Sequence, residues 1–159
     1  MSAFDRESPS GLRGSRHLHA EGSPGFLFWK VFNHWNRQLR TTLELHQLTQ
    51  VQYSILAALV YLSETEAHVM QQDIARLLSM DKMMVSDVSK TLVGRKLLKR
   101  EPHPTDKRAF SLRATPKARE LLELATPLIE ACDDAFFGRL PESELAAFKQ
   151  ALLQLADSC

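Results

Sequence analysis

Side chains that could bind phosphate are concentrated in one part of this 159-residue chain, residues 81–117. This segment contains ten Lys and Arg residues against four Asp and Glu residues, a net charge of +6. Residues 1–80 are neutral and residues 118–159 carry −5, so the whole chain sums to +1. Because Lys and Arg neutralise the phosphates of nucleic acids, residues 81–117 are a candidate nucleic-acid surface. A solvated helix face is the ordinary alternative.

Part of this charge belongs to a predicted helix that begins after Asp81. Asp81 is a suitable N-cap, and Val85, Val88 and Leu92 recur at the spacing of one buried helix face. A helix of this kind can lie in the DNA major groove with its outward N-terminal side chains at the base edges. The outward set that we expect to contact DNA is Lys82, Met83, Ser86, Asp87 and Lys90.

Two members of this outward set have simpler interpretations. Met83, like its neighbour Met84, is equally well explained by core packing or by plain surface exposure. Asp87 would repel phosphate but could accept a hydrogen bond from cytosine N4. A solubilising surface role is the alternative for Asp87.

A β-hairpin is predicted to follow this helix, with strands at Leu98–Glu101 and Ala109–Ala114. Apolar and polar residues alternate in the second strand, which predicts that Phe110 and Leu112 face inward. A helix followed by such a hairpin is the order found in a winged helix-turn-helix, where the hairpin tip reaches the minor groove or the backbone of DNA.

The loop between the two strands contains prolines and a Lys-Arg pair. Pro102 and Pro104 restrict the backbone and cannot donate ladder hydrogen bonds, so we expect them to part the strands into a stiff loop. Arg108 is the candidate for the minor groove, with Asp106 orienting its guanidinium. The expected phosphate contacts are Lys107, Arg100 and Arg113.

Helices that would position these side chains are predicted before the basic segment. Ser23-Pro24 begins a long amphipathic helix, and Thr49 with Gln52 forms a capping box that begins a second. A short third helix is predicted at Gln71–Leu78, with the inward residues Ile74, Leu77 and Leu78.

More helices are predicted after the hairpin. Thr115-Pro116 begins a long helix in which Pro127 is expected to cause a kink, and Pro141 begins the last helix. Residues 1–22 lack periodicity and are interpreted as a flexible arm. The fold class that follows is mainly α with a small β wing.

Five short motifs follow one another between Leu48 and Thr115. They are Leu48-Thr49-x-x-Gln52, the helix start at residues 81–86, Leu97-Leu98-x-Arg100, Pro104-x-Asp106-x-Arg108 and Leu112-x-x-Thr115. Together they resemble the MarR family of bacterial transcription regulators, over roughly residues 23–155. The resemblance implies a winged helix-turn-helix DNA-binding domain at residues 48–115 and a helical dimerisation region at residues 23–47 and 116–159.

The resemblance also implies how such a protein works. A homodimer would read double-stranded DNA, one half of a pseudo-palindromic site for each protomer. A small aromatic or phenolic effector would bind between the two regions, with Lys30 and Tyr53 at matching positions; a surface charge and an ordinary core ring are the alternatives for these two. Where the family usually has Gly, this chain has Lys96, so Gly94 is expected to end the recognition helix.

Other classes of function lack matching residues. No Ser-His-Asp, Cys-His or paired-carboxylate arrangement at informative spacing suggests an enzyme, and no zinc spacing or Gly-rich loop suggests a metal or cofactor. Cys132 is expected to be a buried, inert thiol and Cys159 an exposed one. The longest apolar run is too short to cross a bilayer, so no membrane and a cytoplasmic location are expected.

We therefore expect a sequence-specific transcription regulator, a repressor that a small molecule releases from DNA. The alternative is a winged-helix module that does not bind DNA and whose basic face binds an acidic protein surface.

Overall fold

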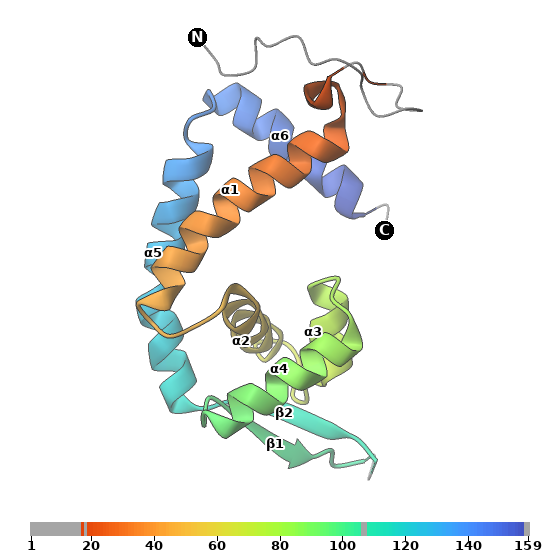
Figure 1. Cartoon of the computed structure of the whole chain (residues 1–159). Helices are drawn as coiled ribbons and strands as arrows, with labels where there is room; N and C mark the ends of the chain where they lie inside the picture. The colour runs from red at the N-terminus through yellow and green to blue at the C-terminus, as the bar shows by residue number, and fades with distance from the viewer. Residues whose placement is uncertain (1–16, 18, 106–107, 158–159) are drawn as a thin grey trace. The chain divides into compact units, whose positions relative to one another are not determined.

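The computed structural model describes residues 17, 19–105 and 108–157 and divides the chain between Arg37 and Gln38 into two compact units. The elements are six α-helices, a short 3-10 helix and one two-stranded sheet among the described residues (Figure 1). In chain order they are η1 (Ala20–Gly22), α1 (Pro24–Glu44), α2 (Gln50–Leu62), α3 (Gln71–Leu77), α4 (Lys82–Gly94), β1 (Leu98–Pro102), β2 (Phe110–Ala114), α5 (Pro116–Phe137) and α6 (Glu142–Ala156). The prediction of a mainly α fold with a small β wing is confirmed.

Helix α1 begins as the sequence predicts and exposes most of its aromatic residues. The Ser23 hydroxyl accepts a hydrogen bond from the Phe26 N–H at 3.3 Å, which helps to satisfy the helix start. Phe28 and Trp29 are 61% and 64% exposed in the single chain. The apolar face of α1 therefore needs a partner that the N-terminal unit alone does not supply.

The core of the larger unit is built around α2. The predicted capping box is present, with Thr49 and Gln52 each accepting from the other's backbone N–H at 3.2 Å. Helix α2 packs against α3, α4, α5 and β2. Its fully buried side chains are Ile55, Leu56 and Leu59.

Helix α3 shows one wrong prediction. Ile74 and Ala75 are buried and Leu78 is half-buried, but Leu77, which was expected to face inward, is 46% exposed. Each residue turns an α-helix by about 100°, so Leu77 lies about 200° from Ala75, on nearly the opposite side. In so short a helix only one narrow face reaches the core.

The wing is a regular antiparallel hairpin whose register pairs Leu98 with Ala114 and Pro102 with Phe110. The expectation that Pro102 would part the strands is wrong, because pairing continues beyond it with a 3.0 Å bond from the His103 N–H to the Ala109 carbonyl. Pro102 occupies a position whose N–H would face away from the partner strand, so no ladder bond is lost. The stiff part of the loop therefore begins one pair later than the sequence suggested.

The two faces of β2 also differ from the prediction. Leu112 is buried as expected and accepts a third extended segment, with a 2.8 Å bond from its N–H to the Val69 carbonyl. Ser111 is buried as well, whereas Phe110 is 45% exposed and not a core residue. Phe110 lies near the hairpin tip, beyond the helices that cover Leu112, so alternation alone misplaced it.

Helix α4 ends differently from the expectation for Gly94. The helix includes Gly94, has Arg95 as its C-cap, and is followed by Lys96 at a φ of +59°. Lys96 thus adopts the left-handed conformation that favours glycine. The chain accepts this strain where the family usually has Gly.

Thr115 joins the wing to α5. Its hydroxyl donates to the Lys96 carbonyl at 2.9 Å and accepts from the Ala118 N–H at 3.2 Å, so it caps α5 as predicted. Helix α5 continues through Pro127, and the kink expected there stays a prediction. Helix α6 follows, with the Phe137 and Phe148 rings 6.2 Å apart.

Candidate nucleic-acid interface

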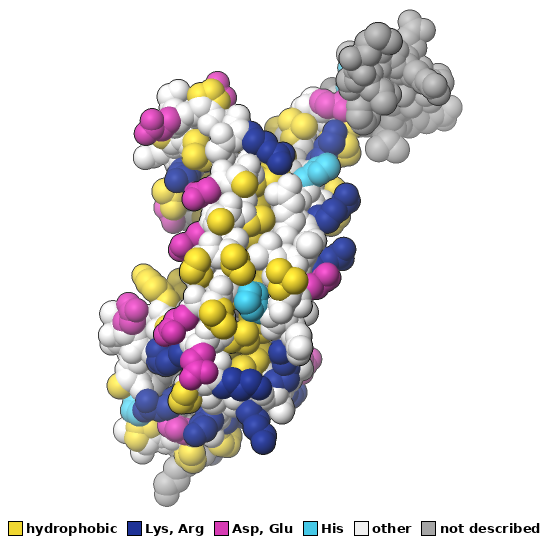
Figure 2. Space-filling view, turned by 90° about the vertical axis from the view of Figure 1, so that its left-hand side faces the viewer, with side chains coloured by type: hydrophobic (Ala, Val, Ile, Leu, Met, Phe, Trp, Pro, Cys, Tyr) yellow, Lys and Arg dark blue, Asp and Glu magenta, His cyan; other side chains and the backbone are white. Residues whose placement is uncertain are grey.

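Lys and Arg side chains gather over the part of the larger unit that carries α3, α4 and the wing. Figure 2 shows them crowded on the visible face at this end, with acidic side chains among them. The patch coincides with the segment of net charge +6. Its electrostatic effect therefore depends on which cations are neutralised by neighbouring carboxylates and which are not.

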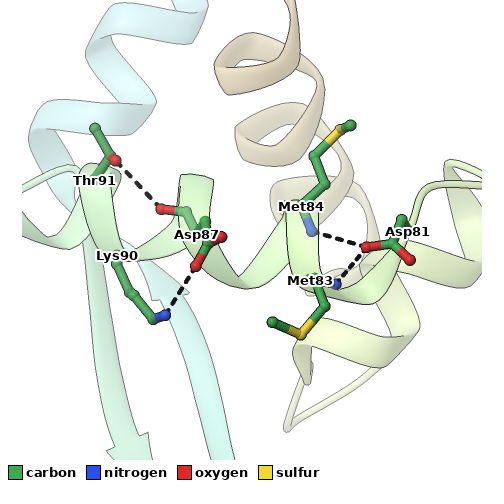
Figure 3. A network of polar contacts seen from close by, with 6 residues as sticks. All are labelled: Asp81, Met83, Met84, Asp87, Lys90 and Thr91. Carbon is green, nitrogen blue, oxygen red and sulfur yellow. Dashed lines mark hydrogen bonds and ion pairs between the residues drawn. The ribbon is translucent and has the colours of Figure 1, made fainter.

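The start of α4 is held by Asp81. One oxygen of its carboxylate, Oδ1, accepts hydrogen bonds from the Met83 and Met84 N–H groups at 2.8 and 3.1 Å (Figure 3). These bonds satisfy two of the four N–H groups that a helix start leaves unpaired. The predicted cap is confirmed, and it places Lys82 and Met83 in the first exposed turn.

The outward set on α4 is largely where the sequence placed it. Lys82, Met83, Asp87 and Lys90 are exposed, and Ser86 is half-buried. Core packing is excluded for Met83, which is 68% exposed and points in a different direction from Met84 (Figure 3). The sequence analysis missed the fully buried Ser89, which shares the inward face with Val85 and Leu92.

Two of the predicted DNA-contacting cations are already in ion pairs. Lys90 Nζ lies 2.9 Å from Asp87 Oδ1 on the exposed face of α4 (Figure 3). Arg113 Nε lies 2.7 Å from Glu101 Oε2 across the hairpin. Both pairs are well exposed, so they contribute little stability, but they reduce the positive charge available to an anion.

Three other cations line one pocket between the start of α4 and the wing. This pocket, which we call the notch, has a volume of about 290 Å³ and includes Lys82, Arg100 and Arg108. The guanidinium carbon of Arg100 lies 4.5 Å from the centre of the Phe110 ring. The other lining residues are Met70, Gln71, Gln72, Ala109 and Leu112.

The sequence analysis did not assign a role to Phe110. The available signal was the period of two in β2, because Arg100 faces Leu112 across the hairpin and Phe110 lies two residues from Leu112 on the same face. Two further predicted site residues, Asp106 and Lys107, lie outside the described residues.

A second pocket lies between α2 and α5. It has a volume of about 490 Å³, and Tyr53 lines it with its hydroxyl 3.1 Å from the Thr126 hydroxyl. Arg119, Leu122 and Pro127 line it from α5. Lys30, the other predicted effector residue, is half-buried on α1 and is not among the residues that line this pocket.

Two searches of the described residues returned nothing. No described helix is both long enough and apolar enough to span a bilayer. Within the same part of the chain, no three His, Cys, Asp or Glu side chains are grouped so that they could hold a metal ion. Cys132 is half-buried rather than buried, and Cys159 lies outside the described residues.

Comparison with known proteins identifies the family. The MarR family profile matches residues 48–110, which include α2, α3, α4 and β1. The HTH-type transcriptional regulator YdcH of Bacillus subtilis is 34% identical over 122 residues, which cover 77% of this chain and 83% of YdcH. Among solved structures, BpsR of Bordetella bronchiseptica, studied for the regulation of its DNA binding by 6-hydroxynicotinic acid, has a TM-score of 0.79 and 26% identity. It covers 87% of this chain and 96% of its own.

A structure solved with DNA bound has the same fold. MepR of S. aureus in complex with DNA has a TM-score of 0.77 at 23% identity and covers 86% of this chain and 98% of its own. The five sequence motifs, the winged helix-turn-helix and these relatives agree, and the chain belongs to the MarR family of transcription regulators.

Proposed function

We propose that this regulator binds a pseudo-palindromic DNA site as a homodimer, represses the adjoining genes and leaves the DNA when a small aromatic molecule binds. Each protomer contributes α4 to the major groove and the wing to the minor groove or the backbone. We propose no catalytic role for the chain, and a regulator of bacterial genes acts in the cytoplasm.

The observation that carries this proposal is the notch beside α4. Lys82 comes from the start of the recognition helix, whereas Arg100 and Arg108 come from the wing, and all three line the same pocket. A phosphate backbone that passes between helix and wing would meet these cations together. Phosphate contacts of this kind position a protein on DNA, and the exposed Met83 and Asp87 are then available to read bases.

The dimer is supported by the exposed apolar faces of the helices outside the winged domain. Phe28 and Trp29 on α1, Leu124 on α5 and Leu153 and Leu155 on α6 are each more than half exposed in the single chain. Exposed apolar side chains in such numbers mark interaction surfaces. We assign residues 23–47 and 116–159 to this dimerisation region.

DNA selection tests the proposal directly. Full-length protein is expected to enrich a two-fold symmetric sequence from a pool of random duplexes, with half-sites about one helical turn apart. Arg108→Ala should then weaken binding to the selected duplex by on the order of tenfold, because an arginine in a narrow minor groove is lost. Fluorescence anisotropy measures the affinity, and sedimentation confirms that the dimer is intact.

The matched control removes a charge elsewhere. Arg40 is exposed on α1 and pairs with Glu44, so Arg40→Ala is expected to leave DNA affinity unchanged. If no sequence is enriched, the protein-interaction module is the better interpretation. If Arg108→Ala binds as tightly as the wild type, the wing takes no part in recognition.

We propose the pocket between α2 and α5 as the effector site. The Tyr53 and Thr126 hydroxyls can hydrogen-bond a phenol, Leu122 and Pro127 can contact a ring, and Arg119 can pair with a carboxylate. The DNA binding of the similar BpsR is regulated by 6-hydroxynicotinic acid, which has these three groups. Lys30 stays a prediction from the family resemblance.

A thermal-shift titration with hydroxylated aromatic acids, beginning with 6-hydroxynicotinic acid, tests this site. A ligand at 100 times its Kd should stabilise the wild type by about 2.7 kcal/mol. Arg119→Gln should reduce the shift for acids but not for the matching neutral phenols. Equal shifts for both proteins would exclude Arg119 as the carboxylate partner, and no shift with any compound would exclude this ligand class.

A further inference from the structure

The notch differs from the rest of the basic patch in how its central cation is held. Lys90 and Arg113 each lie against a carboxylate, Asp87 and Glu101, which neutralises part of their charge. Arg100 instead lies over the face of the Phe110 ring at 4.5 Å. A ring face attracts a guanidinium through its quadrupole and leaves the net positive charge unchanged.

The hairpin register explains why this contact forms. Arg100 pairs with Leu112, and Phe110 lies two residues before Leu112, so the two side chains share one face of the wing. A ring and a guanidinium at this diagonal are within reach of each other across an antiparallel pair. Phe110 is 45% exposed, so core packing does not account for it.

The lining of the notch suits an anion. Lys82, Arg100 and Arg108 supply three cationic groups, and Gln71 and Gln72 add neutral side-chain amides. No acidic side chain lines the notch among the described residues. An arginine whose position is already fixed loses less conformational entropy when it binds phosphate.

We propose that Phe110 is a positioning residue that holds Arg100 in the notch, and that Arg100, Lys82 and Arg108 together form a seat for one backbone phosphate of the DNA. The proposal rests on the DNA binding proposed above and adds the residue that organises it. Phe110 acts through Arg100 and does not itself contact the phosphate.

A double-mutant cycle on the selected duplex tests this role. Phe110→Leu keeps an apolar strand residue but removes the ring face, and it should weaken binding about three- to tenfold, the range of a partly exposed cation–π contact. Arg100→Ala should weaken binding by at least as much and lower the salt dependence by roughly one phosphate equivalent. In the Arg100→Ala background, Phe110→Leu should have no further effect.

Two measurements separate positioning from mere hairpin stability. Phe110→Tyr keeps the ring face and should bind within about twofold of the wild type. Ethylation interference on the selected duplex should show one phosphate in each half-site whose modification weakens the wild type but not Arg100→Ala or Phe110→Leu.

The outcomes distinguish this inference from the proposed function. If the wild type binds the selected duplex but Phe110→Leu binds equally well, or weakens binding as much without Arg100 as with it, the positioning role is overturned while DNA binding stands. An unchanged ethylation pattern in both variants overturns the phosphate seat in the same way. If the wild type enriches no duplex at all, the proposed function and this inference fail together.

Discussion

Raising the salt concentration from about 50 to about 200 mM should weaken DNA binding on the order of a thousandfold, if about six phosphates are neutralised. Three notch cations in each of two protomers, Lys82, Arg100 and Arg108, account for six contacts. Each phosphate that is neutralised releases counterions from the DNA, and the cost of recalling them rises with salt. Lys90 and Arg113 should contribute less, because Asp87 and Glu101 already lie beside them.

The measurement is a series of anisotropy titrations on the selected duplex at four or more salt concentrations. The slope of log affinity against log salt counts the phosphates. Arg108→Ala, present in both protomers, should lower the slope by roughly two equivalents, whereas Arg40→Ala should leave it unchanged. A slope that corresponds to fewer than about two phosphates would contradict the notch as the main contact surface.

Trp29→Asp should separate the dimer and, with it, abolish tight DNA binding. Trp29 is one of the most exposed aromatic residues on α1, so we place it in the dimer interface. Two carboxylates buried there without partners would cost several kcal/mol, which weakens the dimer on the order of a hundredfold or more. A single protomer reads only half of a symmetric site and loses the advantage of joined half-sites.

Sedimentation velocity at micromolar concentration measures this effect, with anisotropy on the selected duplex as the second readout. The control is Leu45→Asp, the same kind of change at an exposed apolar residue that follows α1 in a turn. Leu45→Asp should remain a dimer that binds DNA. If Trp29→Asp stays dimeric, the exposed face of α1 is not the interface.

Local signals predicted the helix starts well. The capping box of Thr49, the Asp81 cap and the Thr115 cap are confirmed because each involves bonds between residues two or three positions apart. The buried residues Val85 and Leu92 follow from helical period alone. Such interactions need no knowledge of the rest of the fold.

Predictions that depended on distant neighbours were less successful. Leu77 and Phe110 are apolar residues that reach no core, since α3 is too short and the hairpin tip extends too far. Pro102 was expected to break a strand pair, but its effect depends on which edge its missing N–H faces. Sequence period does not contain that information.

The sequence by itself determined the class of this protein, because caps, helical periods and linked motifs are local and carry the MarR signature along the chain. Only the tertiary structure decided which cations act together. The fold brings Lys82 from α4 beside Arg100 and Arg108 from the wing, while Arg113 is paired with Glu101 across the hairpin. Charge count is a property of composition, but the field at a site depends on distances between residues that only folding sets.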